Sequence, residues 1–170
     1  MANVTARDNG IGDQFRTAMR TVASTVFLIT TTVQHRSVAL LATSVTSLSV
    51  DPPTLLVCIN RMASIHNALG IGAQFCANVL APDDLAIAQH CVKAKGCERF
   101  AVGDWRYDEP SAPWLASAPA CIFASVVSIT RWHTHSVVFG NVTSASVNRA
   151  TGPLLYADGS YGTSVDIDRG

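Results

Sequence analysis

Charged side chains are scarce in this sequence. Asp, Glu, Lys and Arg make up 14% of the 170 residues, against roughly 25% in typical soluble domains. The twelve basic and twelve acidic residues balance, and no Lys/Arg run follows the chain as a phosphate-binding stripe would. The sequence therefore predicts no nucleic-acid partner. So few charges also favour a surface that is partly covered by a second subunit, and we expect a homodimer.

Secretion and membrane signals are missing as well. The first residues, MANVTARDNGIGDQF, lack the basic-then-apolar pattern of a signal peptide. No apolar run approaches the roughly 20 residues that a membrane-crossing helix needs. We expect a cytoplasmic protein that does not associate with a membrane.

Cysteine pairs with metal-binding or redox spacing are also lacking. The five cysteines form an odd set without a CxxC motif: Cys58, Cys76, Cys91, Cys97 and Cys121. The nearest group of ligands, His90 with Cys91 and Cys97, matches no zinc pattern. We expect free thiols that serve as small buried hydrophobic side chains, and no metal site.

Apolar, β-branched segments dominate what is present. With 48% hydrophobic residues and no internal repeat, the sequence predicts one domain with a large core. Strands are expected at 24–33, 36–45, 54–60, 74–81, 120–132, 135–148 and near 153–162, and short helices at 62–70 and 82–94. The fold class is mainly β, a split, Greek-key-like β-barrel with a few peripheral helices. Residues 13–163 form the domain, between a flexible segment at 1–12 and a tail at 164–170.

A short helix is expected near the start of the domain. Asp13 is a candidate N-cap, and Phe15, Met19 and Val22 fall on one helical face. Such a face is normally buried, so we expect this helix to lie on the body of the domain.

Hydroxyl side chains crowd one segment, ATSVTSLSVDPP at 42–53. Thr43, Ser44, Thr46, Ser47 and Ser49 fall within eight residues that carry no charge, and two prolines follow. Proline has no N–H for a sheet ladder, so the chain turns or lies at a sheet edge there. On the residues alone, this segment is either a solvated barrel edge or the wall of a polar, uncharged binding site.

The order of the segments resembles the short flavin reductases, a family with an FMN-binding split barrel that serves two-component flavin-dependent monooxygenases. The resemblance runs from Phe15 to Gly162 through FRTAMRTVASTVFLITT, ATSVTSLSVDPPTLLVCIN, FCANVLAPDDLAIAQHC, ERF, HSVVFGNV and PLLYADGSYG. Its most specific parts are the hydroxyl segment ending in Asp51-Pro52-Pro53 and the ordered spacing to Asn78, His135 and Tyr161.

The resemblance implies that hydroxyls and backbone amides meet the polar edge of a flavin, FMN or FAD, without placing a full charge beside its ring. The implied cofactor-binding residues are Thr43, Ser44, Val45, Thr46, Ser47, Ser49, Asn60, Arg61, Ser64, Asn78 and Phe100. Ser64, with Arg61 nearby, is either a phosphate contact at a helix start or an ordinary N-cap. Asn78 contacts the flavin or is satisfied by neighbouring backbone groups, and Phe100 lines the pocket or belongs to the core.

A reduced nicotinamide, NADH or NADPH, is the implied second substrate. It has to stack on the flavin, and hydride transfer between two such rings needs no catalytic triad or carboxylate pair. The family typically carries Gly-Asp-His where this chain has His133-Thr134-His135, so His135 is the expected nicotinamide contact and the other two positions depart from the pattern. Tyr161 packs on the nicotinamide side or on the partner subunit.

The resemblance thus implies an NAD(P)H-dependent flavin reductase that supplies diffusible reduced flavin to a separate oxygenase. Two alternatives stay open. One is an enzyme of the same fold that keeps its flavin tightly bound. The other is a non-catalytic split-barrel protein that binds flavin or haem, which the departure at His133-Thr134 keeps possible.

Overall fold

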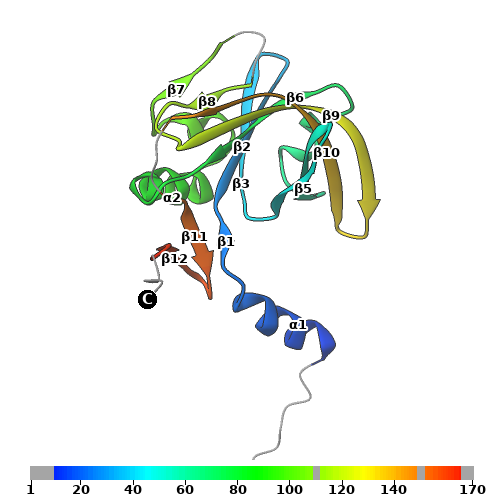
Figure 1. The fold of residues 1–170 in the computed structure, drawn as a ribbon, viewed down its shortest axis with the longest axis vertical. Helices are drawn as coiled ribbons and strands as arrows, with labels where there is room; N and C mark the ends of the chain where they lie inside the picture. Colours follow the sequence, from blue (N-terminus) through cyan, green and yellow to red (C-terminus); the bar gives the residue numbers. More distant parts are fainter. Residues whose placement is uncertain (1–9, 109–111, 149–151, 166–170) are drawn as a thin grey trace, which may run out of the picture.

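Strands rich in apolar residues build a seven-stranded antiparallel sheet in the computed structural model, which describes residues 10–108, 112–148 and 152–165 (Figure 1). In spatial order the strands are β3 (Arg36–Ala42), β2 (Phe27–Val33), β6 (Gln74–Val79), β9 (Ala120–Trp132), β10 (His135–Val147), β5 (Pro53–Asn60) and β4 (Val45–Val50). The predicted mainly β fold is confirmed.

Smaller elements lie around this sheet. A three-stranded sheet contains β1 (Ser24–Thr25), β11 (Leu154–Ala157) and β12 (Ser160–Thr163), and β7 (Trp105–Arg106) pairs with β8 (Trp114–Leu115). The helices are α1 (Ile11–Arg20) and α2 (Leu85–Lys93), with 3₁₀ turns η1 (His66–Ala68), η2 (Pro82–Asp84) and η3 (Gly96–Phe100).

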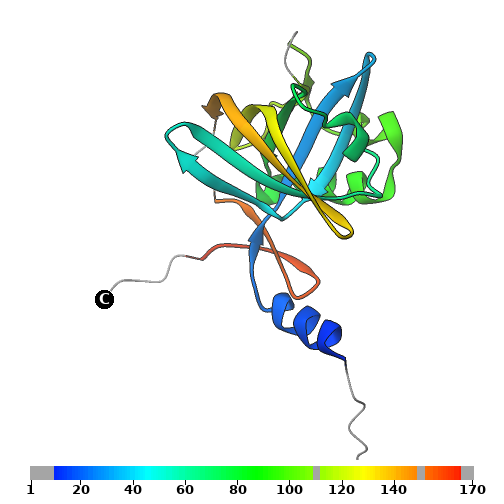
Figure 2. The same ribbon diagram turned by 90° about the vertical axis from the view of Figure 1, so that its right-hand side faces the viewer.

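The two edges of the large sheet are brought together by a short connection. β3 forms one edge and β4 forms the other, yet only Thr43 and Ser44 separate these two strands in the chain. The sheet must therefore curl until its edges meet at this point (Figure 2). Because no strand pairing joins β3 to β4, the barrel is split along one side. We call the Thr43–Ser44 connection the corner.

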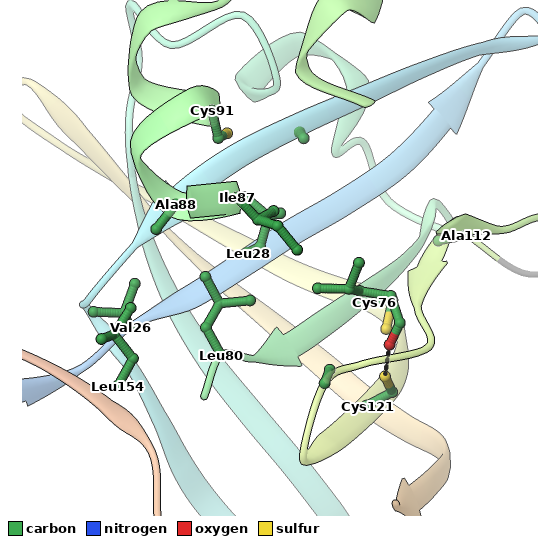
Figure 3. Close-up of a cluster of buried hydrophobic side chains, with 13 residues drawn as sticks. Val26, Leu28, Cys76, Leu80, Ile87, Ala88, Cys91, Ala112, Cys121 and Leu154 are labelled. Atoms are coloured by element: carbon green, nitrogen blue, oxygen red, sulfur yellow. Dashed lines mark hydrogen bonds between the residues drawn. The ribbon is translucent and has the colours of Figure 1, made fainter. Parts of the chain in front are cut away.

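The curled sheet separates two groups of buried side chains. Inside the curl lie Ile29, Leu55, Val57, Ile59, Phe75 and Val138 with their neighbours. A second cluster lies beneath α2, where Ile87, Ala88 and Cys91 pack against strand and loop residues such as Leu28 (Figure 3). The helix begins beside Asp84, whose carboxylate accepts hydrogen bonds from Ala81 N (2.8 Å) and Ser117 Oγ (2.8 Å).

The hairpins expected from the sequence are present. Gln34 and His35 join β2 to β3 with φ angles of 48° and 61°, the left-handed conformation that tight hairpin turns require. Asp158 and Gly159 join β11 to β12 in the same way, with φ angles of 47° and 80°. The strand expected over 36–45 is shorter, because the chain leaves β3 after Ala42 and enters β4 at Val45.

Helix α1 differs from the expectation that it lies on the domain body. It begins at Ile11, Asp13 makes no capping hydrogen bond, and none of its residues is buried. Phe15 is 64% exposed, and Met19 is 49% exposed. The helix extends away from the barrel (Figures 1 and 2) and is attached at its end, where Arg20 Nε bonds Asp158 Oδ1 at 2.9 Å and Asp158 N bonds Arg20 O at 2.9 Å. A regular amphipathic pattern predicts a helix, but it does not say which surface covers the apolar face.

The cysteines agree in part with the sequence expectation. All five are free, and Cys76, Cys91 and Cys121 are buried (Figure 3), whereas Cys58 is half-buried and Cys97 is exposed. Burial raises the pKa of Cys76 and of Cys91, so both thiols stay protonated at neutral pH. Of the expected flexible ends, residues 1–9 and 166–170 lie outside the described residues. Within the described ranges, the helices are too short or too polar to cross a membrane.

Replacing Gly140 by alanine is expected to lower the free energy of unfolding by about 1–2 kcal/mol, because a new methyl group would overpack the core. A Cβ atom at Gly140 would lie 2.6 Å from two ring carbons of Phe75, a fully enclosed side chain, and 3.1 Å from the Ala124 Cβ. Urea denaturation measures the change. Gly70→Ala, where no atom lies within 4 Å of the new Cβ, is the matched control; equal losses in both variants would contradict the prediction.

Candidate functional site

The strands next to the corner present one continuous outer surface. On β5 the residues Leu55, Val57 and Ile59 are buried inside the curl, so the alternate residues point outward. The same alternation on β10, together with the strand register, defines what we call the outer face: Ser44, Thr46, Leu56, Cys58, Asn60, His135, Val137 and Phe139. Hydroxyls from the corner and the imidazole from the β9–β10 turn therefore lie on one side of the sheet.

The register also sets the length of this face. Ser44 lies beside Cys58, whose N–H donates to the Ser44 carbonyl at 2.9 Å, and Asn60 is paired with His135. Ser44 and His135 are thus two residue steps apart along the strands and two strands apart across them. With about 3.4 Å per step and about 4.8 Å per strand, their backbones are separated by roughly 12 Å. Between these two residues lies a half-buried strip with polar groups at both ends, which we call the apolar strip and which consists of Leu56, Cys58, Val137 and Phe139. It is long enough for a flat ring system.

Three adjoining hollows meet at Thr43, with volumes of about 290, 330 and 370 Å³. The largest of them also contains Val45, Thr46 and Ser47, and it opens toward Phe27 and Leu55. Ser44 lines the hollow that residues of α1 help to form, and Tyr161 lines the remaining hollow. Thr43, Ser44, Val45, Thr46, Ser47 and Tyr161 are therefore brought together around the corner.

The polar groups at the corner suit a flavin. Among the described residues, the hydroxyls of Thr43, Ser44 and Ser47 make no hydrogen bond, and that of Thr46 makes a long one of 3.5 Å to Ser47 O. Ser49 is occupied in part, since its Oγ bonds Asp51 O at 3.1 Å. β4 is an edge strand, so alternate backbone amides face away from the sheet. Uncharged donors and acceptors of this kind match the pyrimidine edge of an isoalloxazine ring.

The His133-Thr134-His135 turn is held against the end of β5. His133 has a φ of 46°. Arg61 bonds the turn twice, from its N–H to Thr134 O at 2.9 Å and from its Nη1 to His133 O at 3.1 Å. Thr134 Oγ1 lies 2.9 Å from His135 Nδ1 and thereby orients the imidazole. Asn60, Arg61 and His135 therefore form one group at the far end of the outer face from the corner.

Ser64 and Phe100 occupy a different place. They line a hollow of about 620 Å³ on the side of the β2–β3 hairpin, together with Arg36 and Tyr107. The short helix expected over 62–70 is reduced to the 3₁₀ turn η1, which begins at His66, so Ser64 does not lie at a helix start. Ser64 is exposed and remains near a cation, but the cation in its hollow is Arg36 and not Arg61.

Asn78 is not part of the outer face. It is fully buried, and its Nδ2 donates to Leu28 O at 2.8 Å and to Thr30 Oγ1 at 3.3 Å. Its Oδ1 accepts from Leu115 N at 2.8 Å and from Cys121 Sγ at 3.4 Å. Neighbouring protein groups therefore satisfy the Asn78 amide, which was one of the two alternatives. Asn78 has a structural role instead of the expected flavin contact.

Tyr161 is near the corner rather than near His135. Its ring meets Tyr156 at a centroid distance of 5.2 Å, and both rings line the hollow that contains Thr43. Burial, with smaller effects from Tyr156 and Cys91, raises the pKa of Tyr161. The phenol therefore stays protonated at neutral pH and remains able to donate a hydrogen bond.

Two features were missed in the sequence, one in the hollow that contains Ser64 and one on the outer face. Arg36 follows a hairpin turn and has no motif around it, so nothing in the sequence linked it to Ser64. The half-buried strip of Leu56, Cys58, Val137 and Phe139 follows the period of two in the strands, but identifying it requires knowing that β5 and β10 are neighbours.

A curled, split sheet with an uncharged polar corner and an apolar strip beside it defines the class: a split β-barrel of the kind that holds a flat, polar-edged cofactor. Comparison with known proteins narrows this class. The chain belongs to the flavin reductase family, because the model of the flavin reductase like domain matches residues 19–164.

Relatives share most of the chain's length. The reductase component of an FADH(2)-dependent resorcinol hydroxylase from Rhizobium sp. is 37% identical over 155 residues, covering 89% of this chain and 87% of that protein. An NADH-dependent FMN reductase, RutF, from Variovorax paradoxus is 34% identical over 148 residues, covering 86% and 82%. A flavin reductase domain protein from Arthrobacter sp. has a TM-score of 0.85 with 25% identity, covering 93% of this chain and 98% of that structure.

Proposed function

We propose that this chain is an oxidoreductase that uses NADH to reduce FMN or FAD and then releases the reduced flavin. The observation that carries the proposal is the match, over 89% of the chain, to the reductase component of an FADH(2)-dependent hydroxylase. The uncharged corner next to the apolar strip of the outer face supports it, since that arrangement suits a flavin. NADH is proposed over NADPH because the FMN reductase from Variovorax paradoxus is NADH-dependent.

Residues of the corner would hold the flavin. Ser44 and Thr46 face outward beside Leu56 and Cys58, so their hydroxyls are available at one end of the apolar strip. Thr43, Val45 and Ser47 line the adjoining hollow and leave room for the remaining part of the molecule. No charged side chain lines that hollow, whereas the hollow that Ser44 lines also contains Arg16, Arg20 and Asp158.

Residues at the opposite end of the outer face would hold the nicotinamide. A flavin bound at the corner would supply a ring able to take a hydride from the dihydronicotinamide, and that chemistry would ask no side chain for a proton. The contribution of His135 is orientation, because its Nδ1 is engaged by Thr134 and its Nε2 is left for a polar group of the coenzyme. The half-buried strip beneath excludes water from one side of the stacked rings.

Release of the product implies a second protein. We propose that a separate oxygenase takes up the reduced flavin, as the resorcinol hydroxylase system implies for the relative from Rhizobium sp.. The three hollows at Thr43 are open to solvent, which is compatible with exchange. We also propose a homodimer, in which a second copy covers part of the exposed apolar surface of α1.

A steady-state assay tests the proposed function. NADH and NADPH are each combined with FMN, FAD and riboflavin, and oxidation of the nicotinamide is followed by the loss of its near-ultraviolet absorbance. We expect NADH oxidation that saturates in the added flavin. Activity that is independent of added flavin, with colour that survives dialysis, would instead indicate a tightly held flavin. Flavin binding without any NADH or NADPH oxidation would indicate a non-catalytic protein.

A further inference from the structure

An exposed indole stands beside the proposed nicotinamide contact. Trp132 is the last residue of β9, and its side chain is 69% exposed. In the antiparallel register it is paired directly with His135. Directly paired residues project on the same side of a sheet, so the indole extends the outer face by one strand beyond the imidazole.

The indole packs against the neighbouring turn. Its ring meets the His133 imidazole edge-on, with centroids 5.2 Å apart and an interplanar angle of 83°. The turn that carries His133 is in turn held by the two hydrogen bonds from Arg61. An aromatic pair that is both exposed and held in place is a ready stacking surface, because little conformational entropy is lost when a flat ligand binds to it.

The charges around the indole favour an anionic ligand. Arg61 bonds only carbonyl oxygens in the described part of the chain, and no carboxylate there pairs with Arg61 or with His133. Arginine has five N–H donors, so some remain for a phosphate. A flat, electron-rich base joined to a phosphate therefore fits this end of the face.

We propose that Trp132 is the platform on which the adenine of the nicotinamide dinucleotide stacks, with the pyrophosphate beside Arg61 and the nicotinamide toward His135. This inference rests on the proposed function, since it places the second half of the same coenzyme. A dinucleotide has two bases joined by a pyrophosphate, and the outer face offers an imidazole, a guanidinium and an indole within neighbouring register positions. Trp132 is thus a specificity-determining residue that binds the part of the coenzyme that does not react.

Kinetics with a shortened coenzyme test this assignment. Reduced nicotinamide mononucleotide lacks the adenosine, so it cannot use the platform. With saturating flavin, Trp132→Ala is expected to raise the KM for NADH about tenfold, at the lower end of what base stacking on an aromatic ring contributes. The KM for the mononucleotide and both kcat values are expected to stay unchanged. Trp132→Phe, which keeps a stacking ring, should restore most of the affinity for NADH.

Two further measurements keep the test decisive. Val147→Ala, at the other end of the β10 hairpin strand and similarly exposed, is the control and should leave both KM values unchanged. Quenching of tryptophan fluorescence by 5′-AMP needs no turnover, and we expect it in the wild type and not in Trp132→Ala. The proposal would be overturned if Trp132→Ala raised the KM values for NADH and for the mononucleotide equally, or if 5′-AMP quenched its fluorescence as in the wild type. A change in the oligomeric state of this variant on size exclusion would also overturn it, because that would place the indole against a second copy. If the wild type showed quenching by 5′-AMP but no NADH oxidation, that result would count against the proposed function and not against the binding platform.

Discussion

Replacing Asn78 by alanine is expected to lower the free energy of unfolding by about 3 kcal/mol, because the substitution leaves buried backbone groups without partners. The amide of Asn78, on β6, joins two other strands: it donates to the Leu28 carbonyl on β2 and accepts from the Leu115 N–H on β8. All of these atoms are enclosed, so water cannot replace the lost bonds. Each orphaned group then carries its full desolvation cost in the folded state.

Urea denaturation followed by circular dichroism measures this effect. Asn141→Ala provides the matched control, since Asn141 is an exposed asparagine on β10, and its loss should stay within about 0.5 kcal/mol. If the two variants lose similar stability, the interior network is not what holds β8 against β2. Because Asn78 is remote from the outer face, the kcat of whatever Asn78→Ala protein remains folded is expected to match that of the wild type.

Removing the two outward hydroxyls of the corner together, in Ser44→Ala/Thr46→Val, is expected to reduce kcat/KM for the flavin about 30-fold. Two hydrogen bonds of about 1 kcal/mol each would be lost, and the two changes preserve the shape of the wall closely. The fold should be unaffected, because both side chains are exposed and the one bond that Thr46 makes is long. The measurement is the steady-state dependence of NADH oxidation on FMN and FAD.

The matched control for the corner is Thr32→Val. Thr32 is an exposed threonine on β2 that is paired with Ser37 in the register, away from the outer face, and it shares none of the hollows at Thr43. We expect unchanged kcat/KM for this variant. A double variant that behaves like the control would mean that the flavin is held elsewhere, and the hollow that contains Ser64 and Arg36 would then be the next position to test.

The strands and hairpins were readable in the sequence because their signals are local. Gln34-His35 and Asp158-Gly159 mark turns, and the β-branched runs beside them have the period of a strand. The resemblance to flavin reductases also singled out the hydroxyl segment and His135, and the structure places Ser44, Thr46 and His135 on one face. What it could not supply was the neighbour relation among β5, β10 and β4, since strand order depends on contacts far apart in the chain.

The errors share one physical cause. A buried asparagine, an amphipathic helix and a serine after a strand each have a sequence signal, but the partner of each is chosen by tertiary packing. Asn78 found backbone groups of β2 and β8, α1 extends from the barrel, and Ser64 precedes the helical turn that was expected to begin near it. Trp132 gave no signal because a tryptophan next to a turn becomes informative only when its strand partner is known.

The Thr43–Ser44 connection has a mechanical consequence. Ala42 and Val45 are three residues apart, so their Cα atoms cannot separate by more than about 11 Å even in a fully stretched chain, although they start and end strands on opposite edges of the sheet. The edge strands β3 and β4 are thus held together by covalent bonds at this end. Farther along the gap between them no strand pairing opposes widening. Fluctuations in the distance between β3 and β4 are therefore expected to grow with distance from this connection. The hydroxyl-bearing residues beside it should be the least mobile part of the two edges.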